Sequence, residues 1–321
     1  MVSSITPRHI TEKNVASFVQ EKIQEIIKIT KGNITIAATS GGVDSTIATI
    51  LAGKALGDKL KIIFINTGMM RKSESEVVKE ILAQNNLHVN IINAADLFFD
   101  ALKGKTDPEE KRKAFRRTFY DILSKAAKDS DAKFLVQGTI YPDIIESTRI
   151  KTQHNVLSQI GIDPTKEFGL HVIEPLKQLY KNQVRIVGRF LKVHEDLIQR
   201  QPFPGPGLSV RIIGEVTRDK VKVLQTVTSI VEEELKSYKP SQYFAVLLKG
   251  KMTGVKGDER LLGYAIAIRA VKTDDFMTAR VVEPTWETLK GISNRITREV
   301  PQVVKVLYDI TTKPPSTIEY E

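Results

Sequence analysis

A glycine-rich loop between an apolar run and a helical stretch most constrains the fold of this chain. The run is Ile34–Ala38 and the helical stretch is Thr46–Leu56. The loop between them consists of Ser40, Gly41, Gly42, Val43, Asp44, Ser45 and Thr46. Adjacent glycines let backbone N–H groups turn toward one point, three hydroxyls add donors, and the positive end of the helix dipole faces the same point. The loop therefore predicts a phosphate or pyrophosphate site, with an ordinary glycine-rich turn as the alternative.

The carboxylate of Asp44 is unusual beside a phosphate, and it indicates that Mg²⁺ lies between the two groups. Two other nucleotide motifs fail. The Walker A pattern is broken because Phe99 stands where the first glycine before Gly104–Thr106 should be. The dinucleotide pattern Gly-x-Gly-x-x-Gly that begins at Gly205 ends on Val210. These failures argue against P-loop kinases, GTPases and Rossmann dehydrogenases.

The alternation of apolar strands with helical segments predicts a doubly wound parallel sheet. After a first helix at Glu12–Ile29, the predicted strands are Ile34–Ala38, Lys61–Asn66, His88–Asn93 and Lys133–Gln137. The predicted helices between them are Thr46–Leu56, Ser73–Asn85 and Glu109–Lys128. Ligands of such sheets bind at the carboxyl ends of the strands, where the loop at 40–46 lies.

A proline- and glycine-rich segment, Pro202–Gly207, marks a domain junction because it cannot continue a helix or a central strand. We therefore predict a first domain at 1–201 and a second at 202–321. Beyond the junction we predict strands at Leu208–Gly214, Gln242–Leu248, Leu261–Val271 and Val303–Ile310, and helices at Arg218–Lys236 and Trp286–Arg298. The order β-α-β-β-α-β predicts a small α+β domain with its helices on one face of the sheet.

Composition sets outer limits on function. The chain has 321 residues, of which 41% are hydrophobic, so it can bury a substantial core. No apolar run approaches the roughly eighteen residues that cross a bilayer, and the segment Met1–His9 does not resemble a signal peptide, so we expect a cytoplasmic protein. The absence of cysteine excludes disulfides, Cys-ligated zinc and a thiol nucleophile. The net charge of +10 is explained best by a lysine-rich surface, then by anionic substrates, and does not support nucleic-acid binding.

The loop at 40–46 resembles the pyrophosphate loop of the N-type ATP pyrophosphatases, which cleave ATP between its α and β phosphates. Further motifs narrow the resemblance, and together they cover nearly the whole chain. These motifs are Asp107–Lys113, Gln137–Asp143, Ile145–Ser147, Gln201–Leu208, Gly254–Arg260 and Lys313–Glu321. On these residues the chain resembles the ATP pyrophosphatase subunit of the GMP synthetases, of the two-subunit archaeal type.

The resemblance implies a doubly wound, adenine nucleotide α-hydrolase-like ATP pyrophosphatase domain, followed by a smaller α+β domain for dimerisation. It assigns the loop at 40–46 and Gly138 to ATP, with Asp44 and Asp143 near Mg²⁺. It assigns catalysis to Asp44, Lys151 and Arg112. The residues implied for xanthosine monophosphate (XMP) are Arg112, Gln242, Asp258, Lys313 and Glu319. From the residues alone, Arg112 also fits a solvated basic helix face, and Gln242 fits a surface amide on an edge strand.

The implied reaction is the adenylylation of XMP by MgATP, with loss of pyrophosphate, followed by amination to GMP with release of AMP. The resemblance also implies a mobile lid, which we expect within 103–166, and a homodimer formed through the second domain. About thirty residues precede the pyrophosphatase fold, and no cysteine is present to hydrolyse glutamine. We therefore expect ammonia from a separate glutaminase subunit.

The chain departs from the family pattern at two places. Asn66 stands where many relatives have aspartate, so an amide replaces a carboxylate near the nucleotide. Gln153 stands where relatives have the first of two histidines, so only His154 remains there. An obligatory proton transfer at position 153 is therefore not expected.

Three alternatives stay open. An NAD synthetase shares the loop but leaves the sequence after Pro202 unexplained. A tRNA-thiolating pyrophosphatase would suit the positive charge but usually needs cysteines. A nucleotide-binding scaffold protein would bind ATP without turnover.

Overall fold

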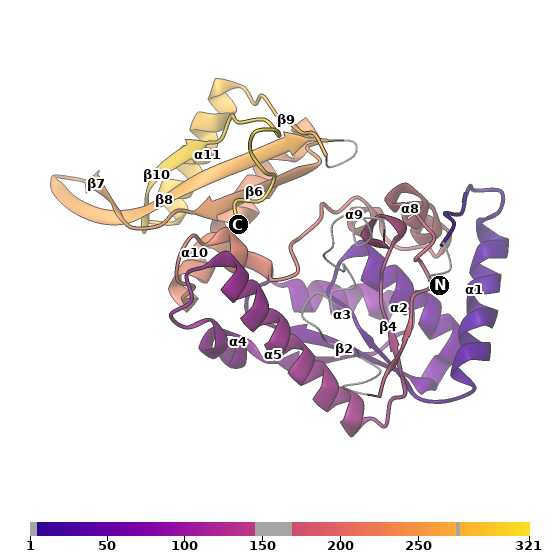
Figure 1. The fold of residues 1–321 in the computed structure, drawn as a ribbon. Helices are drawn as coiled ribbons and strands as arrows, with labels where there is room; N and C mark the ends of the chain where they lie inside the picture. The colour runs from indigo at the N-terminus through magenta and orange to yellow at the C-terminus, as the bar shows by residue number, and fades with distance from the viewer. Residues whose placement is uncertain (1–4, 145–168, 274–276) are drawn as a thin grey trace. The chain divides into compact units, whose positions relative to one another are not determined.

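The computed structural model describes residues 5–144, 169–273 and 277–321 (Figure 1). The chain divides into two compact units. The first unit comprises Met1–Asn66, Ser73–Asn93 and Phe119–Arg200, and the second comprises Thr67–Lys72, Ala94–Thr118 and Gln201–Glu321. The last segment of the second unit begins one residue before the predicted junction, and two short earlier segments join it.

The first unit is built on a five-stranded parallel sheet in the order β3-β2-β1-β4-β5. The strands are β1 (Thr35–Ala38), β2 (Leu60–Asn66), β3 (Val89–Asn93), β4 (Phe134–Val136) and β5 (His171–Ile173). Each predicted strand agrees with an observed one to within one residue at either end. Because the order reverses at β1, the crevice between the carboxyl ends of β1 and β4 is the place where such sheets bind ligands.

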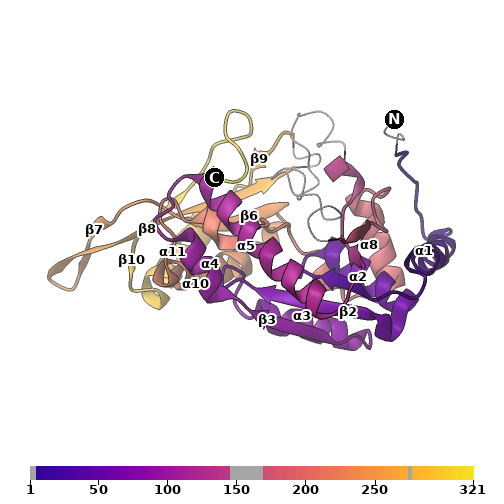
Figure 2. The same cartoon turned by 60° about the horizontal axis from the view of Figure 1, so that its bottom comes forward.

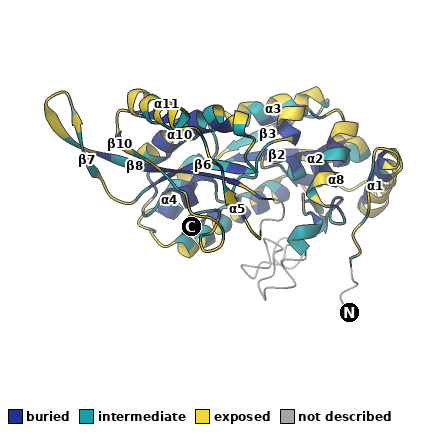
Figure 3. Cartoon of the chain, turned by 90° about the horizontal axis from the view of Figure 1, so that it is seen from above, coloured by how far each residue is buried: buried dark blue, intermediate teal, exposed yellow. Residues whose placement is uncertain are grey.

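Helices cover this sheet and confirm the doubly wound class. They are α1 (Val15–Thr30), α2 (Val43–Leu56), α3 (Glu74–Gln84), α8 (Lys181–Phe190), α9 (Glu195–Ile198) and the C-terminal part of α5 (Pro108–Asp129). Helices α1, α2 and α8 contact one another, and α2 also contacts β2 and β4. Figure 3 shows α3 and α5 on opposite sides of β2 and β3. Strand β5 and helices α8 and α9 were not predicted.

The second unit contains a small sheet in the order β10-β8-β6. Its elements are α4 (Ala95–Leu102), the N-terminal part of α5, η3 (Gly207–Arg211), α10 (Arg218–Leu235), η4 (Lys236–Tyr238), β6 (Gln242–Leu247), β7 (Met252–Lys256), β8 (Glu259–Lys272), β9 (Arg280–Val281), α11 (Trp286–Glu299) and β10 (Val303–Tyr308). Helix α10 packs on β6, α11 packs on β10, and the two helices contact each other (Figure 2). This agrees with the prediction of a small α+β sheet with its helices together.

The predicted strand Leu208–Gly214 is wrong. Residues Gly207–Arg211 form a 3₁₀ helix, and only Ile212 makes a single parallel bridge, to Leu247. The physical reason lies in the backbone carbonyls of this segment. Three of them converge on the buried ammonium group of Lys111, whereas successive carbonyls of an extended strand point to alternate sides and could not meet at one atom.

The observed sheet also contains a long hairpin that was not predicted. Strand β8 runs for 14 residues, and its N-terminal part pairs with β7 while its C-terminal part pairs with β6 and β9. Figure 3 shows the β7 end of the hairpin as exposed and the middle of β8 as buried. Among the residues that the structure describes, no helix is long and apolar enough to cross a membrane.

Candidate active site: a phosphate loop and a C-terminal tail

The loop at 40–46 joins the carboxyl end of β1 to the start of α2. Gly41 has a φ of 78°, in the left-handed region that favours glycine, and Gly42 precedes the first residue of α2. Helix α2 begins at Val43, three residues before the predicted start, so Asp44 and Ser45 lie in its first turn. The first amides of a helix have no acceptor within the helix, and they can therefore bind an anion.

The loop hydroxyls form a small cluster of their own. The Oγ atoms of Ser40 and Ser45 lie 3.0 Å apart, and Ser45 Oγ also donates to the carbonyl of Gly42 at 3.1 Å. The backbone N–H of Ser40 donates to Ser45 Oγ at 3.3 Å. These bonds hold the loop in a compact turn, with Ser40 and Gly42 exposed and Thr46 buried.

Gly138, which follows β4, runs directly against the start of α2. A Cβ atom at position 138 would lie 2.6 Å from the backbone N of Ser45 and 2.7 Å from the backbone C of Asp44. No side chain fits such a close approach, because both atoms belong to the backbone. The loop at 40–46 and Gly138, both assigned to ATP by the resemblance, therefore lie side by side at the carboxyl ends of β1 and β4.

The carboxylate of Asp44 is held by Lys181, the first residue of α8. The Nζ atom of Lys181 donates to Oδ1 and Oδ2 of Asp44 at 2.9 and 2.7 Å. Both side chains keep about a quarter of their surface exposed, at 26% and 29%. The sequence analysis missed Lys181 because its partner lies 137 positions earlier in the chain.

A buried ion pair supports the loop from behind. Glu74, whose side chain is 3% exposed, accepts two hydrogen bonds from Arg200 at 2.6 and 2.9 Å. The same guanidinium donates to the backbone carbonyl of Gly41 at 3.3 Å. A Cβ atom on Gly41 would lie 2.5 Å from Oε1 of Glu74. The pair therefore positions the phosphate loop, and neither residue was singled out from the sequence.

The implied magnesium site has the donor chemistry that the ion prefers. Magnesium is usually held by one or two carboxylates together with substrate phosphates and water. Asp44 supplies one carboxylate beside the phosphate loop. Asp143 follows β4, and its Oδ2 accepts a hydrogen bond from the backbone N–H of Ile140 at 2.9 Å. Among the described ranges 5–144, 169–273 and 277–321, no group of three or more His, Cys, Asp or Glu residues could hold a metal by itself.

In the second unit, Gln242 and Lys313 lie at the same end of the sheet. Gln242 begins β6 and is paired with Val271, while the backbone of Lys313 pairs with Ala279 through two hydrogen bonds of 3.0 Å. Val271 and Ala279 belong to one hydrophobic cluster with Ile318 of the C-terminal tail. Gln242 is 9% exposed, and within the described part of the chain its Oε1 atom has no hydrogen-bond partner. A buried acceptor of this kind is a natural point for ligand contact.

Glu319 lies on the tail and is paired with a buried arginine. Arg211 donates from Nε and Nη2 to the two carboxylate oxygens of Glu319, at 3.1 and 2.7 Å. The carboxylate keeps 27% of its side-chain surface exposed, so it remains accessible to a ligand.

Asp258 is not brought together with the other residues implied for XMP. It lies in the exposed turn between β7 and β8, whereas Gln242 pairs with Val271 at the far end of β8. Twelve residues of extended strand, at about 3.3 Å each, separate these two ends by roughly 40 Å. Within one chain, Asp258 and Gln242 are therefore too far apart to contact the same nucleotide.

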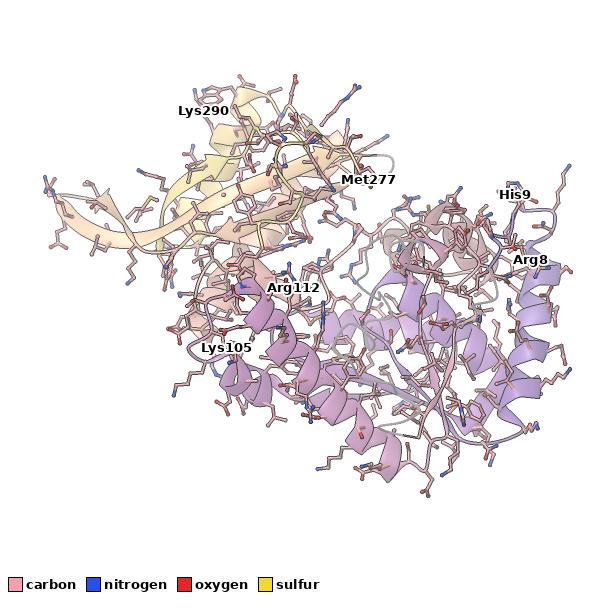
Figure 4. All side chains as sticks on the ribbon, in the orientation of Figure 1. Arg8, His9, Lys105, Arg112, Met277 and Lys290 are labelled. Atoms are coloured by element: carbon pink, nitrogen blue, oxygen red, sulfur yellow. The ribbon has the colours of Figure 1, made fainter. Side chains whose placement is uncertain are left out.

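Arg112 lies in the second turn of α5 and is labelled in Figure 4. Its Nη1 atom donates to Glu109 at 2.5 Å, and a quarter of its side chain is exposed. Lys151 and His154, together with the departure at Gln153, lie outside the described residues, as do residues 145–166 of the predicted lid. At the other departure, Asn66 Nδ2 donates to Oδ1 of Asn93 at 3.2 Å.

Comparisons with known proteins match the two parts of the chain to different family models. A family model described as "PP-loop domain" matches residues 15–195, and one described as "GMP synthase C terminal domain" matches residues 228–320. The chain is 50% identical over 309 residues to a subunit of "GMP synthase [glutamine-hydrolyzing]" from Archaeoglobus fulgidus, covering 96% of this chain and 100% of that one. The chain belongs to this family of GMP synthase subunits. The resemblance read from the motifs is thereby confirmed.

Other members of this family of GMP synthase subunits match equally broadly. The protein of Methanocella arvoryzae is 51% identical over 308 residues, and that of Pyrococcus horikoshii is 49% identical over 308 residues. Each match covers 95% of this chain and 98% of the relative. An NH3-dependent NAD synthetase from Campylobacter jejuni matches with a TM-score of 0.46 at 16% identity, over 58% of this chain and 76% of that one, which is too distant a likeness to bear on the site.

Proposed function

We propose that this chain is the synthetase subunit that converts XMP to GMP with ATP and ammonia. The C2 oxygen of XMP attacks the α-phosphorus of ATP, and the bond to the β-phosphate oxygen breaks to release pyrophosphate. Ammonia then adds at C2, loses a proton, and displaces AMP to leave GMP. The observation that carries the proposal is the phosphate loop of a PP-loop domain in a chain that aligns almost from end to end with subunits of GMP synthases.

In this proposal the first unit binds ATP. The first amides of α2 and the hydroxyls of Ser40 and Ser45 hold the phosphate oxygens, and Gly138 allows the backbone after β4 to approach them. Lys181 keeps Asp44 oriented and adds a positive charge beside the phosphates. These groups stabilise negative charge that moves onto pyrophosphate as the α–β bond breaks, so the protein itself needs no covalent nucleophile. Magnesium held by Asp44, with Asp143 nearby, would neutralise further phosphate charge.

The second unit would bind XMP. The ammonium group of Lys313 suits the phosphate of XMP, the carboxylate of Glu319 suits ribose hydroxyls or base N–H groups, and the buried Oε1 of Gln242 can accept a hydrogen bond from the nucleotide. Arg112 is suited to a phosphate or to developing negative charge, since its guanidinium forms two parallel hydrogen bonds with oxyanions.

The names of the relatives specify a subunit of a glutamine-hydrolysing enzyme. We therefore assign ammonia production to a separate glutaminase subunit, with free ammonium as its substitute. A homodimer formed through the second unit and a cytoplasmic location belong to the same proposal. Light scattering on the purified chain tests the dimer.

The decisive experiment measures pyrophosphate and GMP formed by the purified chain with MgATP, XMP and saturating ammonium. We expect both products only when XMP is present, and neither from Asp44→Ala. Lys313→Ala should raise the KM for XMP by about tenfold or more, because a charge-assisted hydrogen bond is lost. Lys290→Ala, which removes an exposed lysine of α11, is the matched control (Figure 4).

The other outcomes are equally specific. Pyrophosphate release that depends on deamido-NAD instead of XMP would identify an NAD synthetase. Salt-sensitive binding of tRNA would favour a tRNA-thiolating enzyme. ATP binding without turnover would leave only a scaffold role.

A further inference from the structure

The C-terminal tail, residues 309–321, is held by three cations whose side chains are completely buried. They are Lys111 of α5, Arg211 of η3 and Arg269 of β8, each with 0% of its side chain exposed. All three belong to the second unit, as does the tail. The tail has no regular helix or strand, and the cations hold it together with the backbone pairing of Lys313 to Ala279 and the packing of Ile318.

Arg269 holds both ends of the loop that contains Lys313. Its Nη1 donates to the carbonyl of Thr311, and its Nη2 donates to the carbonyl of Thr317 at 2.9 Å. Its Nη1 also lies 3.2 Å from the carboxylate of Asp309. One rigid guanidinium therefore sets the separation of the two ends of the Lys313 loop, which a flexible lysine side chain could not do.

Arg211 fixes the next acidic residue of the tail. Its Nε and Nη2 atoms donate to the two carboxylate oxygens of Glu319. Its Cζ atom lies 3.9 Å from the ring centroid of Phe244 and 5.2 Å from that of Phe203. The two rings keep the guanidinium plane in place, so the direction of the Glu319 carboxylate is set by residues on β6 and on the proline-rich segment.

Lys111 holds the last residue of the chain. Its Nζ donates to the carboxylate of Glu321 and to the backbone carbonyls of Ser209, Ile212 and Gly214, at 3.2, 2.8 and 3.2 Å for the three carbonyls. The segment that carries Arg211 is therefore tied to the chain terminus through one ammonium group.

Removing three cations from water is costly, and packed apolar residues usually give equal or greater stability at the same positions. Their common feature is that each fixes a part of the tail next to a residue implied in XMP binding. We propose that Arg211, Arg269 and Lys111 are positioning residues for XMP, which set the Lys313 loop and the Glu319 carboxylate before the nucleotide binds. The inference rests on the proposed function, since it concerns the same XMP site.

The test uses Arg211→Lys and Arg269→Lys in the full chain, because lysine keeps the positive charge but lacks the planar guanidinium with its several donors. We expect each to raise the KM for XMP by about tenfold while kcat and the KM for ATP change less than about twofold. Arg295→Lys is the matched control, since it makes the same change at an arginine that pairs with Glu233, Glu234 and Glu299, none of which belongs to the tail. It should leave the KM for XMP unchanged.

Hydrogen exchange on the same variants without any ligand gives a readout independent of activity. The hydrogen-bonded tail amides of Thr311, Lys313 and Ser316 should exchange at least about tenfold faster in the two variants than in the wild type, while those of β6 and β8 keep their protection. Glu321→Gln provides a third variant should either arginine variant fail to fold, with the same expected result, because glutamine keeps an acceptor for Lys111 but removes the carboxylate charge.

Wild-type protein that makes no GMP would overturn the proposed function. Wild-type turnover combined with an unchanged KM for XMP in all folded variants would overturn the positioning role alone. A fall in kcat at saturating XMP and ATP, together with a general loss of amide protection, would show that the cations only stabilise the fold. This result would also overturn the inference.

Discussion

Single glycine positions show most directly how the phosphate site is shaped at the residue scale. Gly41 is needed both for its positive φ and for the space that Glu74 occupies beside it. Gly138 is needed for space alone, because it touches the backbone of Ser45. The glycine-rich loop was evident in the sequence, whereas the close contact at Gly138 depends on two segments nearly a hundred residues apart.

Gly138→Ala is expected to impair ATP use severely. The added methyl group would lie 2.6 Å from the backbone N of Ser45, so the start of α2 must shift and its first amides must turn away from the phosphates. We expect kcat/KM for ATP to fall by about 100-fold or more, since misplacement near 1 Å has effects of this order. Steady-state pyrophosphate release at varied ATP measures it.

Gly291→Ala in α11 is the control for the same chemical change. No atom lies within 4 Å of the added Cβ, and alanine favours a helix over glycine by about 1 kcal/mol. This variant should be active and slightly more stable. Normal ATP kinetics in Gly138→Ala would contradict the assignment of that position to the phosphate site.

At the scale of elements, β10 and the tail after it carry half-buried tyrosines. The hydroxyl of Tyr308 in β10 donates to the carbonyl of Val282 at 2.5 Å, and that of Tyr320 donates to Asp309 Oδ2 at 2.9 Å. Burial raises the pKa of Tyr308 to about 12, and burial together with the hydrogen bond to Asp309 raises the pKa of Tyr320 to about 12. The folded chain therefore holds both of these protons to a higher pH than the unfolded chain does.

These tyrosines predict a loss of stability in alkali. Between pH 10 and about 12 a tyrosine in the unfolded chain has lost its proton while the folded one keeps it, so the free energy of unfolding falls as pH rises. Each tyrosine should contribute on the order of 1–2 kcal/mol to this fall. Urea unfolding of wild type and Tyr308→Phe from pH 9 to 11.5 measures it.

The Tyr308→Phe curve should decline less steeply than that of the wild type over this range. Tyr180→Phe, at a position that is 41% exposed, controls for removing one hydroxyl elsewhere. Parallel curves for wild type and Tyr308→Phe would show that Tyr308 is not protected in the folded chain.

On the scale of the whole molecule, the second unit is assembled from three separate stretches of chain. Besides its interactions with Lys111, the 201–321 segment is tied to Met69, whose carbonyl accepts from Leu208 N at 2.7 Å, and to Arg71, which pairs with Glu232 at 2.9 Å. The segments Thr67–Lys72 and Ala94–Thr118 therefore cover side chains and carbonyls of the 201–321 segment, which a fragment beginning at residue 201 would expose to water.

A fragment of residues 201–321 is therefore expected to fold poorly on its own. It lacks the cation that holds Glu321, and it lacks the buried apolar side chains of Phe98, Leu102 and Phe115. Losing apolar packing on this scale destabilises a small domain by several kcal/mol. We expect a broad, weakly cooperative thermal transition by circular dichroism.

A second fragment adds back the helical segment that packs on residues 201–321. Residues 94–118 joined to 201–321 by a flexible linker should recover a sharper transition, since α4 and the first half of α5 return. A sharp transition in the shorter fragment, equal to that of the longer one, would show that Lys111 and its neighbours are dispensable for this unit.

The sequence by itself determined the parallel sheet, the helices of the second unit and the phosphate loop, because each depends on residues that are neighbours in the chain. Apolar periodicity reports which face of an element is buried, and adjacent glycines report a turn, so both can be read locally. Only the tertiary structure decided the partners of the buried cations and the position of Asp258. Lys181 meets Asp44, and Lys111 meets Glu321, across more than a hundred residues. The predicted strand at 208–214 was wrong for the same reason. Its carbonyls converge on the ammonium group of Lys111, which lies about a hundred residues earlier in the chain, so no local pattern could indicate this arrangement.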